Sequence, residues 1–343
     1  MLIPFPYPPM EARVAGALPP GDGWQFEPKW DGFRCLVFRD RDEVRLQSKS
    51  GQPLERYFPE VVARIKGLRT ASFVLDGELV VPDPSGKGAL SFDDLLQRIH
   101  PAASRVKRLA AEFPAALVVF DLLAEGKTRL VDRPLTDRRA RLERFVAKEK
   151  ADGIFLSPAT GDRAEAGRWL KGAGSGLDGV VAKRADAPYA SGSRDAMIKV
   201  KQRRTADCVV GGFRYATGKK VVGSLLLGLY GEDGLLHHVG FTSSFKAAEK
   251  TALTKKVEAL EGGKGFSGRA PGGPSRWSTE RSSQWVPLHP KLVVEVEYDH
   301  FSQKRFRHGT KFMRWRPDKA PKQCTFEQVE GTPRGAARWL KKV

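Results

Sequence analysis

Apolar and polar positions in the first two hundred residues predict a mixture of strands and helices. Short apolar runs rich in Val, Leu and Phe are bounded by polar turns, as expected for strands that become buried. The predicted strands cover residues 34–38, 44–48, 73–81, 116–123, 179–183 and 197–201. The first two flank a polar turn at residues 40–42, which is typical of a hairpin.

Two helices are predicted between these strands. Ser91 precedes residues 92–99 and is a good N-cap, because its hydroxyl can accept a hydrogen bond from the first helical turn. Thr136 likewise opens a helix whose apolar positions include Leu142, Phe145 and Val146.

The pattern changes near residue 204. Short Val- and Leu-rich runs broken by Gly follow (CVVGGF, VVGSLLLGLY and LLHHVGF), and later come a helix-like stretch at 246–260 and a strand at 292–298. The Gly-rich, basic segment 262–274 is predicted to be a mobile connection, and a loop that contacts DNA is the alternative. About five short strands with one helix predict a small β-barrel of the OB type.

The length of 343 residues suits two domains of ordinary size. We therefore expect an α+β domain over residues 1–203 and an OB-fold β-barrel over residues 204–343. The hydrophobic fraction of 41% is large enough to build a core in each.

The charge balance indicates a polyanionic partner. The chain has 59 Lys and Arg against 40 Asp and Glu, a net charge of +19. Residues 303–319 alone carry seven basic residues and one acid, beside aromatic side chains, which favours nucleic acid. We expect binding to duplex DNA to weaken with salt, by a slope of about −0.9 per neutralised phosphate.

Three widely spaced cysteines lack the spacing of a zinc site or a disulfide framework, so they are expected to be reduced. The Pro-rich start of the chain has no secretory signal, and no apolar run reaches membrane-spanning length. These features predict a soluble, cytoplasmic protein.

The most informative motif is Lys29-Trp30-Asp31-Gly32-Phe33-Arg34, which leads directly into a predicted strand. A Lys just before a tight Gly turn can be held rigidly in a cleft. An amine attacks phosphorus only when it is unprotonated, and free Lys has a pKa of about 10.4. Neighbouring cations and a metal would lower that value and also attract a polyphosphate.

Four further motifs follow in a fixed order. Asp76-Gly77-Glu78 places two carboxylates inside an apolar strand, where they require a cation or hydroxyl partner. Phe120-Asp121 is expected to end a strand, and Asp178 and Lys183 stand at the two ends of another. Lys199 and Lys201 are two residues apart, so both point to one face of their strand, as suits phosphate binding.

This ordered series resembles motifs I, III, IIIa, IV and V of the covalent nucleotidyltransferases, which include DNA ligases, RNA ligases and mRNA capping enzymes. Arg314-Trp315-Arg316-Pro317-Asp318-Lys319 resembles motif VI. The opening (PPM, then GWQFEPKWDGFRCLVF) and the ending (KFMRWRPDK) are similar to the short bacterial ATP-dependent DNA ligases of the ligase C type. The resemblance implies an ATP-grasp-like adenylation domain followed by an OB-fold domain.

The resemblance also implies a role for each matched residue. Lys29 would attack the α-phosphate of ATP and hold AMP by a phosphoramide bond. The side chains expected to bind the nucleotide are Glu27 and Phe120 at the adenine, Arg34 and Glu78 at the ribose, Lys199 and Lys201 at the α-phosphate, and Lys183 at the end of motif IV. From the OB domain, Arg316, Asp318 and Lys319 would align the leaving pyrophosphate.

Metal and DNA contacts are implied in the same way. Asp178 and Glu78 would bind Mg²⁺ or Mn²⁺. Asp31 would lie near the reacting ends of nicked double-stranded DNA, where Arg194 and Lys49 would bind the 5′-phosphate. The enzyme is expected to be a monomer, and repair polymerases or primases are its implied protein partners.

Two positions depart from the family pattern. Motif IV commonly begins with Glu, but Asp178 is one methylene shorter, so we expect altered metal affinity. Lys49 stands where the family usually has Arg, and it loses the two-pronged grip of a guanidinium. We therefore expect weaker discrimination for 5′-phosphorylated nicks.

Two other functions remain open at this level. An RNA ligase or a capping guanylyltransferase would share the motifs, and base contacts that decide between ATP and GTP are not evident in the sequence. A catalytically silent nick-binding scaffold is the alternative from another class, although every matched motif keeps a chemically competent residue.

Overall fold

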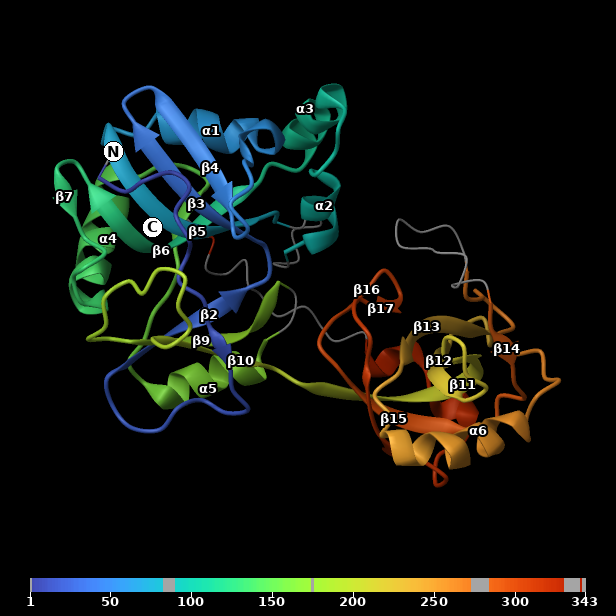
Figure 1. Cartoon of the computed structure of the whole chain (residues 1–343). Helices are drawn as coiled ribbons and strands as arrows, with labels where there is room; N and C mark the ends of the chain where they lie inside the picture. Colours follow the sequence, from blue (N-terminus) through green and yellow to red (C-terminus); the bar gives the residue numbers. More distant parts are fainter. Residues whose placement is uncertain (1, 83–89, 174–175, 273–283, 330–339, 341–343) are drawn as a thin grey trace. The chain divides into compact units, whose positions relative to one another are not determined.

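The computed structural model describes the whole chain except residues 1, 83–89, 174–175, 273–283, 330–339 and 341–343. The described chain forms two compact units, which meet in the sequence between Gln202 and Arg203 (Figure 1). Leu340, near the C-terminus, packs against an apolar cluster of the first unit.

The first unit contains a four-stranded sheet in the order β1-β10-β9-β2. Its strands are β1 (Arg13–Val14), β10 (Met197–Lys201), β9 (Leu177–Arg184) and β2 (Trp24–Trp30). Helix α5 (Arg163–Lys171) covers one face, where Ala166 and Trp169 pack against Phe26 of β2. The opposite face of this sheet carries charged side chains, which include Lys29 and Lys199.

A second sheet in the same unit has the order β4-β3-β5-β6-β7, with β8 paired to β6 in parallel. Its strands are β3 (Phe33–Asp40), β4 (Glu43–Ser48), β5 (Ser72–Val80), β6 (Ala116–Glu125), β7 (Thr128–Arg129) and β8 (Ile154–Leu156). The helical segments of this part are η1 (Glu55–Tyr57), α1 (Pro59–Lys66), α2 (Phe92–Gln97), α3 (Ala103–Glu112) and α4 (Leu135–Glu149). Apolar side chains of α1, α2 and α4 join those of the sheet in one core.

All the predicted strands of this unit are present, with ends that differ by a few residues. The expectation that Phe120 and Asp121 end a strand was wrong, because Leu122, Leu123 and Ala124 extend β6 as buried residues. Ser91 caps α2 as predicted, accepting a hydrogen bond from the Asp94 backbone. Helix α4 begins one residue before Thr136, after Pro134, whose side chain makes no capping hydrogen bond.

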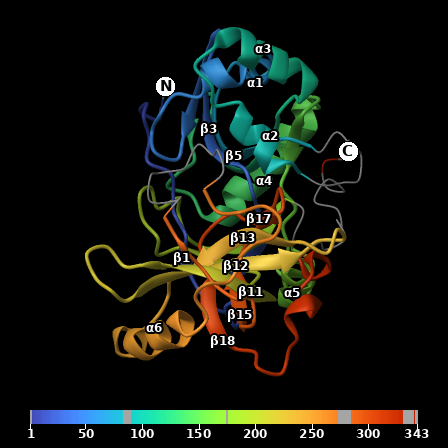
Figure 2. The same cartoon turned by 90° about the vertical axis from the view of Figure 1, so that its right-hand side faces the viewer.

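The second unit is built on a sheet in the order β13-β12-β11-β15-β18 (Figure 2). Strand β14 also pairs with β11. Its strands are β11 (Arg204–Tyr215), β12 (Val222–Tyr230), β13 (Leu236–Thr242), β14 (Val286–Pro287), β15 (Val293–Tyr298), β16 (Phe301–Ser302), β17 (Arg305–Phe306) and β18 (Lys311–Trp315). The helical segments are η2 (Ala247–Glu249), α6 (Lys250–Glu258), η3 (Pro321–Gln323) and η4 (Phe326–Gln328).

This order is the one expected of an OB-fold. Three meandering strands are followed by a helix, after which β15 pairs with the first strand of the meander. A bridge between Thr242 and Thr310 links the end of β13 to the residue before β18 and closes the sheet. The predicted α+β class with a C-terminal OB-fold is confirmed.

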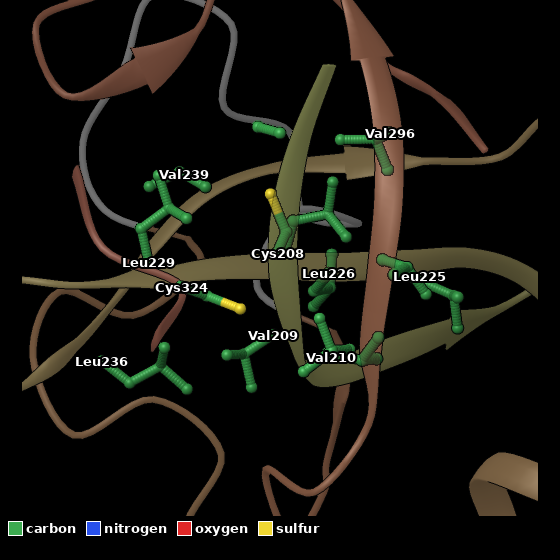
Figure 3. Close-up of a cluster of buried hydrophobic side chains, with 14 of the residues drawn as sticks. Cys208, Val209, Val210, Leu225, Leu226, Leu229, Leu236, Val239, Val296 and Cys324 are labelled. Atoms are coloured by element: carbon green, nitrogen blue, oxygen red, sulfur yellow. The ribbon is translucent and has the colours of Figure 1, made fainter. Parts of the chain in front are cut away.

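The core of the second unit lies inside this curved sheet (Figure 3). Cys208 and Cys324 are free cysteines that point into it among Val and Leu side chains. Phe266 from the Gly-rich segment also packs into this core, so residues 262–272, which contain no helix or strand, are anchored there. Residues 273 and 274 of that predicted connection lie outside the described part of the chain.

Across the described residues, no helix is both long enough and apolar enough to span a lipid bilayer.

Candidate active site

A pocket opens between the two sheets of the first unit, with walls from β2, β9 and β10 on one side and β3, β5 and β6 on the other. Eight of the residues selected from the sequence line it: Glu27, Lys29, Arg34, Lys49, Glu78, Phe120, Lys183 and Lys199. Segments as far apart in the chain as β2 and β10 thus bring their charged side chains to one cavity.

Lys29 lies near the end of β2, where the chain leaves one sheet and crosses to β3 in the other. Gly32 makes this crossing possible, because a Cβ there would collide with the Leu79 carbonyl. The Lys29 side chain is about one quarter exposed, and its Nζ lies 2.5 Å from Asp178 Oδ2. The amine is therefore held in place and remains accessible from the pocket.

Asp178 binds a second lysine from the neighbouring strand. Lys201 Nζ lies 3.1 Å from the same Asp178 oxygen. The register explains this, since Lys29 and Lys201 both pair with Gly179 from opposite sides of β9. Gly179 has a φ of +145°, and a Cβ there would collide with the Val200 carbonyl, so only glycine allows this close packing.

Glu27 and Lys183 form a buried ion pair at 2.8 Å beside the pocket. Lys183 also donates to the Phe120 carbonyl at 3.2 Å, and its Nζ lies 4.6 Å from the centre of the Phe120 ring. The two charges satisfy each other away from water, and they tie β2 and β9 to β6.

Arg34 is held by a buried network under the pocket. Its guanidinium donates two hydrogen bonds to Asp76, both at 2.5 Å, and lies 4.7 Å from the centre of the Phe120 ring. Tyr189 donates to Asp76 at 2.6 Å and accepts from the Met10 backbone at 3.0 Å. Burial lowers the pKa of Arg34, but attraction to Asp76 outweighs it and raises the pKa above its ordinary value. Asp76 therefore binds the Arg34 cation and positions it.

Two pocket residues have pKa values shifted toward neutral pH. Burial raises the pKa of Glu78 to about 7, although Arg34 and Lys29 act in the opposite direction. Burial also lowers the pKa of Lys199, and the nearby Lys29 and Lys49 lower it further. Titrating groups that share a cleft are typical of a functional site.

The Glu78 pKa makes stability depend on pH. The folded protein binds the Glu78 proton up to about pH 7, whereas the unfolded chain releases it near the ordinary value of 4.5. The resulting stabilisation is complete below pH 4.5 and is lost as the pH rises through 7. We expect Glu78→Gln to gain stability relative to wild type between pH 5 and pH 8, on the order of 1–3 kcal/mol. Urea unfolding of both proteins at the two pH values measures this, and parallel curves would contradict it.

The two side chains expected at a 5′-phosphate both bind Glu11. Lys49 Nζ lies 3.1 Å from Glu11 Oε2, and Arg194 donates to the same oxygen at 2.9 Å. Hydrogen bonding to Lys49, and then to Arg194, holds the pKa of Glu11 below its ordinary value. One carboxylate oxygen of Glu11 thus lies between the mostly exposed cations of Lys49 and Arg194.

The C-terminal motif lies in the second unit, just after β18. The Arg316 guanidinium pairs with Asp318 at 2.8 Å and with Asp207 of β11 at 2.8 Å. Lys319 also pairs with Asp207, at 2.7 Å. Arg316 lowers the pKa of Asp318 to about 2.

The donor set around Asp178 suits a metal ion that arrives with phosphates. Among the described residues, no three His, Cys, Asp or Glu side chains come together as a metal-binding group. Asp178 supplies a hard carboxylate beside the pocket lysines, and Mg²⁺ is commonly bound by one or two carboxylates together with substrate phosphates. A site completed by a polyphosphate therefore fits these residues better than one made of protein ligands alone.

Sequence reasoning missed three residues that the structure ties to this site. Met10, the last residue of the quoted PPM opening, and Glu11 both line the pocket, but neither was given a role. Asp207 carried a usable signal, because it is the single acid of β11 and is followed directly by the apolar run CVVGGF, so a buried partner is required.

Comparison with known proteins gives a consistent result over both units. The family described as ATP dependent DNA ligase domain matches residues 14–201, and the ATP dependent DNA ligase C terminal region matches residues 218–319. DNA ligase C1 of Mycolicibacterium smegmatis is 44% identical over 95% of this chain and 94% of its own. DNA ligase C of Mycobacterium tuberculosis is 43% identical, again over 95% and 94%.

The fold is also similar to that of a solved Lig E DNA ligase, with a TM-score of 0.54 over 90% of this chain and 100% of the other. The sequence identity to that structure is 16%, so this likeness concerns the fold alone.

Proposed function

Because the chain belongs to the ATP-dependent DNA ligases, we propose that it seals nicks in duplex DNA through an AMP held covalently on Lys29. The observation that carries this proposal is the placement of an accessible Lys29 amine in a pocket with Lys199 and Arg34, next to Asp178. Such a pocket can gather a triphosphate and present a nucleophile to it.

In the first step, the Lys29 nitrogen attacks the α-phosphorus of ATP. The Lys29 ammonium group first loses a proton to solvent, which reaches its partly exposed side chain. The N–P bond then forms as the bond to the β-phosphate oxygen breaks, and pyrophosphate leaves. Lys199 and Lys201 hold the α-phosphate, because both project from one face of β10. Asp178 orients the amine, and Arg34, Glu27, Glu78, Phe120 and Lys183 surround the nucleoside.

Asp178, with Glu78 as a second carboxylate, would hold Mg²⁺ or Mn²⁺ against the phosphates. A divalent cation there supplies Lewis-acid stabilisation of the negative charge on the transferring phosphate. The shorter Asp178 side chain is compatible with direct or water-mediated binding.

In the next two steps, AMP passes to the 5′-phosphate of the nick, and the 3′-hydroxyl then attacks that phosphate and releases AMP. The residues assigned to the nick are Asp31, Lys49 and Arg194. Arg316, Asp318 and Lys319 act on the leaving pyrophosphate in the first step. We assign residues 1–203 to the adenylation domain and residues 204–343 to the OB-fold domain.

Glu11 is expected to compete with the nick 5′-phosphate for Lys49 and Arg194. Glu11→Gln should tighten binding to a 5′-phosphorylated nick by about two- to fivefold, because exposed ion pairs of this kind contribute about 0.2–1 kcal/mol each. Binding to a nick with a 5′-hydroxyl should change little, since that DNA does not displace the carboxylate. Equilibrium titration of fluorescent nicked DNA at fixed salt measures both affinities.

The matched control is Glu43→Gln, which removes the same charge from an exposed glutamate paired with Arg45. An equal gain in Glu43→Gln, or an equal gain on both nicks, would contradict a competing role for Glu11.

The proposal is tested by incubating the protein with labelled ATP or GTP and then with nicked DNA, nicked RNA or mixed strands. A ligase of this class becomes labelled by ATP and seals the DNA nick. Labelling by GTP alone would favour a capping guanylyltransferase, and sealing of RNA alone would favour an RNA ligase. Absence of any label would favour a silent nick-binding scaffold.

We further propose that the enzyme acts in cytoplasmic DNA repair as a monomer, beside repair polymerases or primases. The excess of basic residues supports contact with DNA along its backbone.

A further inference from the structure

Asp207 is the meeting point of two cations from motif VI. It lies on β11, is buried, and accepts from Arg316 Nη1 through both carboxylate oxygens, at 2.8 and 3.0 Å. Lys319 donates to the same carboxylate at 2.7 Å. One acid in the core strand thus fixes the tips of two long side chains.

The Asp207 backbone is itself held in place. Its N–H donates to Gln328 Oε1 at 3.0 Å, and its carbonyl accepts from Gln328 Nε2 at 3.2 Å. The Arg316 backbone donates to the Val293 carbonyl of β15 at 2.9 Å. The Asp207 carboxylate is therefore held in a fixed position relative to the Arg316 backbone.

Arg316 and Lys319 would repel each other without an acid between them, and each side chain has many rotamers to lose on binding a ligand. Asp318 pairs with the outer side of Arg316, but its own side chain is largely exposed. It therefore cannot replace the buried anchor. Ordering both cations before the ligand arrives reduces the entropy that binding must overcome.

We propose that Asp207 is a positioning residue, which orients Arg316 and Lys319 toward the β- and γ-phosphates of ATP during transfer of AMP to Lys29. This inference rests on the proposed function. Asp207 acts through the two cations and takes no part in bond making or breaking.

The test is Asp207→Asn in the full-length protein, because asparagine keeps the size and loses the charge. Formation of the protein–AMP adduct is measured in a single turnover over a range of ATP concentrations. Sealing of nicked DNA that already carries AMP on its 5′-phosphate is measured separately. We expect adduct formation at low ATP to fall at least tenfold, with a higher apparent KM for ATP, and sealing of adenylated DNA to stay within about twofold.

A purely structural role would lower both steps and the melting temperature together, and that outcome would overturn the proposal. Unchanged adduct formation would also overturn it. Asp207→Glu restores the charge and should recover part of the adenylation rate.

Asp233→Asn is the matched control, since it removes one carboxylate charge from an exposed aspartate of the same unit, paired with His237. Equal losses in the two Asn variants would overturn a specific role for Asp207. Adduct formation by the wild-type protein distinguishes a failure of the proposed function from a failure of the Asp207 inference. If the wild-type protein forms no AMP adduct, both the proposed function and this inference fail. If the wild-type protein forms the adduct and Asp207→Asn forms it equally well, only this inference fails.

Discussion

Replacing Lys29 with alanine is expected to abolish the covalent protein–AMP adduct and to lower ATP-dependent nick sealing by roughly 10³-fold or more. The side chain supplies the only atom that is proposed to bond to the α-phosphate, and alanine has no nucleophile to replace it. Intact-protein mass spectrometry after incubation with ATP and Mg²⁺ reads the adduct, and a gel assay reads the sealed strand.

The same variant should keep its fold and still seal DNA that is already adenylated, at a reduced rate. Asp178 loses one partner in Lys29→Ala but keeps the ion pair with Lys201. Lys127→Ala is the matched control, because Lys127 is exposed in the turn between β6 and β7. An AMP adduct of full occupancy in Lys29→Ala would show that another residue is the nucleophile.

Most of the longer strands of both units could be predicted because their apolar runs are bounded by polar turns. Strand β2, which carries Lys29, and β18 were not predicted, because charged residues interrupt their apolar positions. The ordered motifs and the family resemblance also identified most of the charged residues that line the pocket, because each motif stands at a strand end or on one strand face. Period-two spacing correctly placed Lys199 and Lys201 on the same face of β10. The spacing of residues along one strand is therefore sufficient to predict which face of that strand a side chain occupies.

Partners that come from distant segments could not be predicted. Glu11 contacts Lys49 and Arg194 only because the N-terminal segment runs beside β10, and Asp207 contacts Arg316 across more than a hundred residues. These pairings depend on strand order and register, which the periodicity of one strand does not encode. The interpretation of Phe120-Asp121 as a strand end, although the apolar pattern continued to residue 123, was wrong for a related reason. Asp121 looked like a strand end, but Arg138 pairs with it inside the core.

This buried pair leads to the second large effect, since Asp121→Ala is expected to cost about 3–5 kcal/mol of folding stability. Asp121 of β6 accepts from Arg138 of α4 at 2.8 and 3.0 Å, and both side chains are about 1% exposed. Burial lowers the pKa of Arg138, but attraction to Asp121 raises it overall, so the guanidinium stays charged. Removing the carboxylate leaves a cation in the core with two backbone carbonyls and the face of the Tyr189 ring as neighbours, and none of these carries a negative charge.

Urea unfolding of the full chain measures the loss, and Asp132→Ala is the control. Asp132 pairs with Arg129 on the surface, where such a pair contributes about 0–1 kcal/mol. The double variant Asp121→Ala with Arg138→Met should recover part of the stability, because it removes the unpaired charge as well. A loss below about 1 kcal/mol in Asp121→Ala would mean that water reaches Arg138 in the native state.

Because Phe120 and its carbonyl precede Asp121 and contact Lys183, the same variant should also weaken ATP binding. The pair would then connect the stability of the β6–α4 packing to the shape of the nucleotide pocket.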